Sequence, residues 1–193
     1  MIGQTRILAI AIVPALLAGC GGDSSEPEAA TAPAADATYL ATVEPSGARD
    51  VIQARESARD GEEVTVVGRI GGSVDPWIDG RAAFTIVDPS LKACSDIPGD
   101  GCPTPWDYCC EASIGESSAT VKVVDEKGDL VKADARELLN VKELDTVVVQ
   151  GKAQRDEAGN LTVLAERVYV RPPVVSVPEK GAESEAHDHE HKD

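Results

Sequence analysis

The chain has 193 residues and a net charge of −16, with 34 acidic against 18 basic side chains. Such an acidic chain is not expected to bind nucleic acid, because affinity for phosphates comes largely from lysine and arginine. Both ends are poor in large apolar residues and rich in Ala, Pro, Glu and Ser. The part that can fold is therefore one small domain of about 110 to 125 residues.

The first 20 residues carry a targeting signal. Arg6 precedes an apolar run over residues 7–17 that is too short to span a bilayer but suits the core of a signal peptide. The following Leu17-Ala18-Gly19-Cys20 resembles the cleavage motif of bacterial lipoproteins. The resemblance implies that residues 1–19 are removed and that Cys20 is lipidated, so that the protein is anchored in the cell envelope and faces the periplasm. Gly21 after this cysteine favours the outer membrane; an ordinary secreted protein with a chance cysteine is the alternative.

Three segments are expected in the mature chain. Residues 20–48 are predicted to be the lipidated cysteine and a disordered tether, because they hold almost no large apolar residue before Tyr39. Residues 49–171 are the folded domain. Residues 172–193 are a disordered acidic tail that contains all three histidines. These histidines, His187, His189 and His191, are weak candidate ligands for Zn, Cu or Ni. A solvated acidic tail is the simpler interpretation.

The pattern of residues 49–171 predicts an all-β domain. Asp50 and Gln53 are typical of a helix start, and this helix would end near Gly61. Five strands are then predicted from alternating apolar residues, at 64–70, 83–87, 119–124, 146–150 and 161–170. A short helix is expected between the third and fourth strands, from the capping box at 134–137 through about residue 144.

This order of elements is typical of the OB-fold, a five-stranded Greek-key barrel with a helix between strands 3 and 4. A long cysteine-rich loop at 89–117 would lie between strands 2 and 3. Residues 63–68, 84–88 and 144–151 resemble the skeleton of OB domains of the nucleic-acid-binding type, and a β-sandwich fits less well. The activity of that family is not expected here, because residues 60–171 hold 12 basic against 21 acidic side chains and few aromatics on the strands.

The cysteine-rich loop holds Cys94, Cys102, Cys109 and Cys110. In an oxidising compartment, an even number of closely spaced cysteines indicates disulfides first. A bond between Cys109 and Cys110 would need a strained ring. Cys94 and Cys102 are therefore each expected to form a disulfide with one of the adjacent cysteines, Cys109 or Cys110. These two disulfides would brace a loop that is long for a connection inside a compact domain.

Three functional interpretations compete with structural disulfides. Four thiolates could hold Zn or Cu(I), although the spacing is not that of a usual zinc knuckle. Thiol-redox chemistry is a further alternative, but the loop has no C-x-x-C and no His or Lys between its cysteines. The third is recognition of a partner by Trp106, Asp107 and Tyr108. The two aromatic side chains would otherwise pack inside the loop.

Residues 163–169, followed by Pro172-Pro173, resemble the end of the periplasmic haem chaperone of cytochrome c maturation, which is also a membrane-anchored OB barrel with a disordered tail. That family attaches haem through a His or Cys shortly before a Tyr. Here Glu166, Arg167 and Val168 precede Tyr169, so the attachment residue is missing and haem is not expected.

No nucleophile–base pair, phosphate loop or paired-carboxylate motif indicates an enzyme. The sequence predicts a non-catalytic, membrane-anchored binding lipoprotein with an envelope protein or small ligand as partner. The second interpretation is Zn or Cu binding or delivery by the loop cysteines, the tail histidines or both, and the third is a thiol-redox protein. No cofactor other than Zn or Cu is expected.

Overall fold

The computed structural model describes residues 36–173. The predicted signal peptide, Cys20 and the three tail histidines lie outside these residues. The described part is mostly β with a few short helices, none long and apolar enough to cross a bilayer. Its elements are β1 (Arg49–Asp50), α1 (Val51–Ser57), β2 (Glu63–Ile70), β3 (Ala83–Val87), the 3-10 helix η1 (Cys94–Asp96), β4 (Ser118–Val123), α2 (Ala135–Leu139), β5 (Thr146–Arg155) and β6 (Leu161–Val170).

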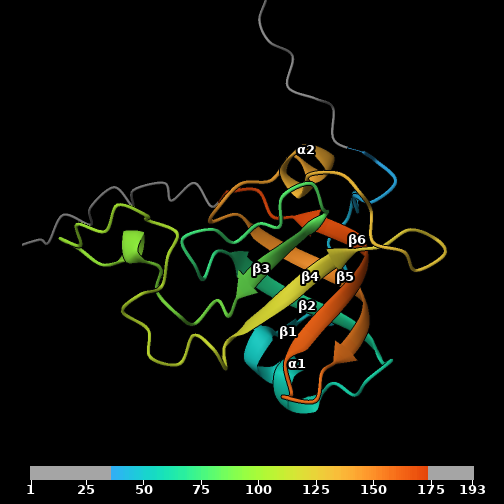
Figure 1. Ribbon diagram of the computed structural model, residues 1–193, viewed down its shortest axis with the longest axis horizontal. Coiled ribbons are helices and arrows are strands. Elements are labelled where there is room, and N and C mark those ends of the chain that lie inside the picture. Colours follow the sequence, from blue (N-terminus) through green and yellow to red (C-terminus); the bar gives the residue numbers. More distant parts are fainter. Residues whose placement is uncertain (1–35, 174–193) are drawn as a thin grey trace, which may run out of the picture. The chain divides into compact units, whose positions relative to one another are not determined.

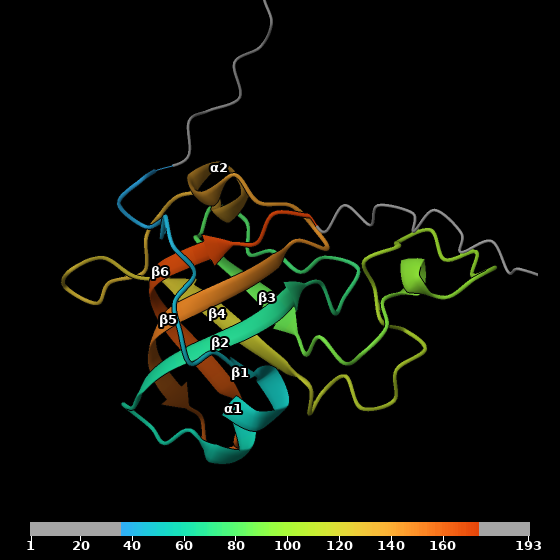
Figure 2. The ribbon, with the colours of Figure 1, turned by 180° about the vertical axis from the view of Figure 1, so that it is seen from behind.

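The six strands form one sheet in the order β1-β2-β3-β4-β6-β5, and β2 also pairs with β5, so that the sheet closes on itself (Figures 1 and 2). The pairs β1–β2 and β4–β6 are parallel and the others are antiparallel. This arrangement is all-β and OB-like. The sheet has six strands rather than the predicted five, because Arg49 and Asp50 pair with Val66 and Val67 of β2.

The interior is aliphatic and is built from alternate residues of each strand. Phe84 and Val121 are cross-strand partners and both are fully buried, so β3 and β4 bury the same face. Gly68 lies where a Cβ would come within 2.9 Å of the Ile86 side chain, which allows α1 to pack closely over β2 and β3. Burial of these side chains is the main contribution to the stability of the domain.

Helix α1 starts where predicted, but its cap comes from elsewhere. The Asp50 side chain makes no capping hydrogen bond. Instead the Ile52 backbone N–H donates to the carboxylate of Asp88 at the end of β3, at 2.8 Å, and Asp88 is buried. The helix ends at Ser57 rather than near residue 61, because Ala58 is already extended.

Helix α2 begins as predicted, since the Asp134 side chain accepts a hydrogen bond from the Arg136 backbone N–H at 2.9 Å. It ends at Leu139, not near residue 144. Asn140 adopts a left-handed conformation with φ of 52°, which terminates the helix.

The domain includes residues that the sequence assigned to the tether. Tyr39 and Leu40 pack against the core, and the Ala41 backbone N–H donates to the Val168 carbonyl at 2.9 Å. Leu40 also forms a parallel bridge with Val168 of β6. A tether that extends to residue 48 is therefore wrong, because these apolar side chains bury surface on the sheet.

Candidate metal centre

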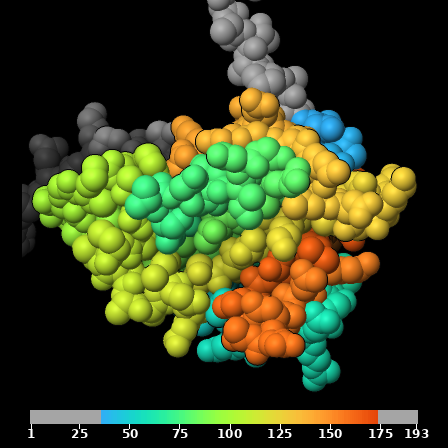
Figure 3. Space-filling model, viewed as in Figure 1, coloured from blue at the N-terminus to red at the C-terminus, as the bar shows by residue number. Residues whose placement is uncertain are grey.

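Residues 88–117, between β3 and β4, form a lobe beside the barrel (Figures 1 and 3). Backbone hydrogen bonds join the two sides of this loop. The Cys94 N–H donates to the Asp107 carbonyl at 2.8 Å, and the Ser95 N–H donates to the Pro105 carbonyl at 3.0 Å. These bonds bring η1 beside the segment that leads to Cys109 without any covalent cross-link.

The loop is also attached to the barrel. Arg69 of β2 forms an ion pair with Asp96 of η1, whose carboxylate also accepts a hydrogen bond from the Ala93 N–H at 3.0 Å. The side chain of Trp106 donates from Nε1 to the Val74 carbonyl at 3.0 Å. These contacts fix the loop at both of its sides.

Gly71, which directly follows β2, is a point of close approach between the loop and the barrel. A Cβ at this position would lie 2.6 Å from the Trp106 carbonyl oxygen and 3.0 Å from Cε2 of Tyr108. Both distances are shorter than ordinary van der Waals contact, so only glycine fits without a shift of the loop.

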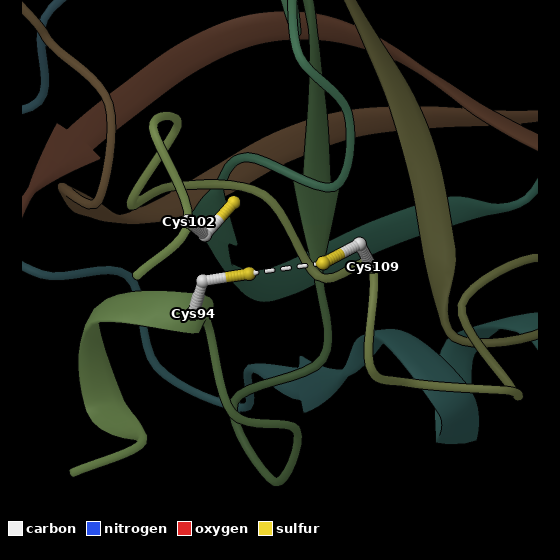
Figure 4. A group of neighbouring side chains, drawn as sticks. All are labelled: Cys94, Cys102 and Cys109. Atoms are coloured by element: carbon white, nitrogen blue, oxygen red, sulfur yellow. Dashed lines mark hydrogen bonds between the residues drawn. The ribbon is translucent and has the colours of Figure 1, made fainter. Parts of the chain in front are cut away.

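Three of the four loop cysteines come together. The Sγ atoms of Cys94, Cys102 and Cys109 all lie within 4.8 Å of one another, and those of Cys94 and Cys109 are 3.5 Å apart and point toward each other (Figure 4). Cys110 is outside this thiol cluster, with its Sγ 4.0 Å from that of Cys109. All four are free thiols, so the two predicted disulfides are absent from this structure.

The three clustered thiols differ in environment. Burial, followed by the hydrogen bond with Cys109, raises the pKa of the Cys94 thiol to about 12. Hydrogen bonds with Thr104 lower the pKa of the Cys102 thiol. Its Sγ donates to the Thr104 carbonyl oxygen at 3.4 Å and is also 3.4 Å from the hydroxyl of that residue. The Cys94 hydrogen bond lowers the pKa of Cys109, but Cys110 and burial outweigh it, and the net shift is upward. A metal ion would displace protons from these thiols.

The sulfur geometry fits one metal ion. Three sulfurs bound at about 2.3 Å in tetrahedral angles lie roughly 3.8 Å apart. The observed range, from 3.5 Å to within 4.8 Å, includes this separation. Sulfur donors favour soft ions such as Cu(I) and also bind Zn. Among residues 36–173, no fourth His, Cys, Asp or Glu joins the cluster. The donor set among the described residues is therefore three cysteine sulfurs.

The predicted recognition residues mostly support the loop instead. Tyr108 is 1% exposed and packs against Val87 and Ala93, so its side chain is not at the surface. Burial raises the pKa of its hydroxyl, which has no hydrogen-bond partner among the described residues. Asp107 is half-buried and its carboxylate accepts a hydrogen bond from the Tyr108 N–H at 2.7 Å. Of the three, only half-buried Trp106 presents aromatic surface to solvent.

Sequence reasoning missed Arg69, Asp96 and Gly71, which position the loop. In the sequence, Arg69 is a polar residue of an alternating strand, and Asp96 is one of several loop acids. No local pattern pairs two residues that are 27 positions apart. The Gly71-Gly72 pair was the one available signal, because adjacent glycines after a strand often mark a close backbone approach.

No family model matches the chain, and no curated protein matches it. The solved structures that are similar to it at a low level include the following two. The hypothetical protein ygiW from E. coli is 18% identical, with 66% of this chain and 94% of that chain covered and a TM-score of 0.36. The OBody AM1L10 bound to hen egg-white lysozyme is 12% identical, with 69% and 99% covered and a TM-score of 0.39. The OB-like assignment rests on the strand pairing described above.

Proposed function

We propose that this protein is a membrane-anchored lipoprotein of the cell envelope that binds one soft metal ion, Cu(I) or Zn(II), through Cys94, Cys102 and Cys109. The observation that carries the proposal is the convergence of three sulfurs within 4.8 Å on a loop that contains no cross-link. Its role is binding or delivery of the ion, not catalysis.

The supports around the cluster favour a binding site over a purely structural disulfide. Backbone hydrogen bonds, the Arg69–Asp96 ion pair and the contact at Gly71 already hold the loop in place. The cysteines are therefore not needed to close the loop. A site whose ligands are held by other contacts loses less entropy on binding, which raises its affinity.

The membrane anchor in this proposal rests on the sequence. Leu17-Ala18-Gly19-Cys20 is the reason to assign lipidation at Cys20 and a periplasmic location, and Gly21 after the cysteine favours the outer membrane. The carrier would be an OB barrel that presents the loop on one side, and the negative net charge favours cations and disfavours nucleic acid. Loss of membrane association in a Cys20→Ser variant, measured by fractionation, would test the anchor separately.

The binding test uses the reduced full-length protein and a chromogenic chelator that competes for Zn²⁺ or Cu(I). One ion per chain is expected. Replacement of any clustered cysteine by serine (C94S, C102S or C109S) should weaken binding at least about 100-fold, because two thiolates are left to hold the ion. C110S is the matched control, since that thiol is exposed and outside the cluster.

Circular dichroism and the comparison with C110S show whether a loss of binding is specific to the three clustered cysteines. The circular dichroism of each serine variant should match the wild type, because the contacts that hold the loop in place do not involve the thiol groups. Equal losses from C110S and from the three other variants would contradict the assignment of the ligands. The absence of stoichiometric binding in the reduced protein would refute the proposal.

A further inference from the structure

We infer that Cys94 and Cys109 form a reversible thiol–disulfide exchange site, and that the disulfide and the metal ion exclude each other. The mutual exclusion of disulfide and metal ion rests on the proposed function, whereas the exchange site itself does not. It identifies one pair among the pairings that the sequence left open and assigns the oxidant to a chemical class, an external disulfide.

The geometry selects this pair. The sulfurs of Cys94 and Cys109 are 3.5 Å apart and face each other (Figure 4). A disulfide bond of about 2.05 Å would require them to approach by about 1.5 Å. Cys109 and Cys110 start farther apart, at 4.0 Å, and as adjacent residues they would close a strained ring. Cys102 has hydrogen bonds to Thr104 instead.

Exposure sets the order of the chemical steps. Cys109 is exposed, whereas Cys94 is only 3% exposed and cannot meet a bulky reactant. The Cys109 thiolate attacks one sulfur of the external disulfide, forms a mixed disulfide and releases the first thiolate. The Cys94 sulfur then attacks the Cys109 sulfur and releases the second. Two protein thiols are oxidised, the external disulfide is reduced to two thiols, and these take up the two protons that the protein loses.

The same two sulfurs are metal ligands, which is why the states exclude each other. Once they are joined, Cys102 is the only thiolate left in the cluster. A single thiolate cannot chelate an ion, so oxidation releases the metal. Conversely, a bound ion occupies both sulfurs and protects them. The site therefore holds its ion under reducing conditions and releases it to the solution or to an acceptor when a disulfide reacts with it.

The test treats the reduced full-length protein with oxidised glutathione, with and without Zn²⁺. Zinc is the probe because it has no redox chemistry. After alkylation of free thiols, cleavage before aspartate at Asp96, Asp100 and Asp107 places Cys94, Cys102 and the Cys109–Cys110 pair in three separate peptides. Mass spectrometry then reads the linkage directly.

Without zinc, we expect the peptide of Cys94 to be linked to the peptide of Cys109 and Cys110, with Cys102 alkylated. The C110S variant should form the same link, and C109S should not form it. At a free zinc concentration of about 100 times Kd, about 1% of the chains are metal-free, so oxidation should slow about 100-fold. The oxidised protein should bind no zinc, and reduction should restore binding.

The outcomes separate this inference from the proposed function. The C102S variant should still form the disulfide although it has lost a metal ligand. A link through the Cys102 peptide, or a Cys94 that stays alkylatable, would overturn the exchange site. Zinc binding that survives oxidation would overturn mutual exclusion. A disulfide in a protein that never binds metal would refute the metal proposal and mutual exclusion but leave the exchange site standing.

Discussion

The contact at Gly71 should control both the stability of the loop and the affinity of the thiol cluster. In a Gly71→Ala variant the new Cβ would lie 2.6 Å from the Trp106 carbonyl oxygen. Ordinary contact begins near 3.4 Å, so the backbone at Trp106 must move by roughly 0.8 Å. Crowding of this kind costs about 1–3 kcal/mol of unfolding free energy. Cys109 is three residues farther along and should move with that backbone.

We expect Gly71→Ala to weaken Zn²⁺ binding at least about tenfold, which corresponds to about 1.4 kcal/mol. Chelator competition measures the affinity, and urea unfolding followed by circular dichroism measures the stability. Gly101→Ala is the matched control, because Gly101 adjoins a ligand but has no heavy atom within 4 Å of the Cβ position and no positive φ. Wild-type affinity in Gly71→Ala, or a larger loss in Gly101→Ala, would refute the argument that this contact positions the site.

Three further predictions concern the supports of the fold and the loop. Asp88→Ala should lower the free energy of unfolding by about 2–3 kcal/mol, measured in urea, because it leaves the Ile52 backbone N–H without its buried acceptor; an unchanged midpoint would contradict that role. The Arg136 side chain lowers the pKa of the Asp134 carboxyl in the folded protein. The ionised Asp134 therefore contributes its full stabilisation of the folded state above the unfolded pKa of about 3.9, and this contribution is lost as the pH falls through the lower folded pKa. The difference in urea midpoint between wild type and Asp134→Asn should accordingly shrink on acidification below about pH 4, and a constant difference would show that the charge is not involved. Arg69→Gln should weaken zinc binding several-fold with the far-ultraviolet spectrum unchanged, since it removes the ion pair that joins β2 to the loop; a collapsed spectrum would mean that it acts on the barrel instead.

Much of the fold followed from local pattern. Alternating apolar residues located the strands, with β3 and β6 matching the predicted limits, because side chains on a half-buried strand alternate between two faces. Asp134 was recognised as a cap because its hydrogen bond reaches only two residues along the chain. The sixth strand and the Asp88 cap were missed, since each depends on a partner that is distant in sequence.

The sequence by itself identified the cysteine loop as the feature that needs a functional explanation, because its length and cysteine content are properties of the chain. It could not decide which sulfurs meet. Four cysteines allow several arrangements with the same spacing. The arrangement in which three sulfurs converge and Cys110 stays outside depends on tertiary contacts. These are the backbone hydrogen bonds across the loop, the ion pair of Arg69 with Asp96 and the contact of Gly71 with Trp106. Burial of Tyr108 was decided in the same way, because an aromatic side chain in a loop can face either the solvent or the barrel until the loop is folded against it.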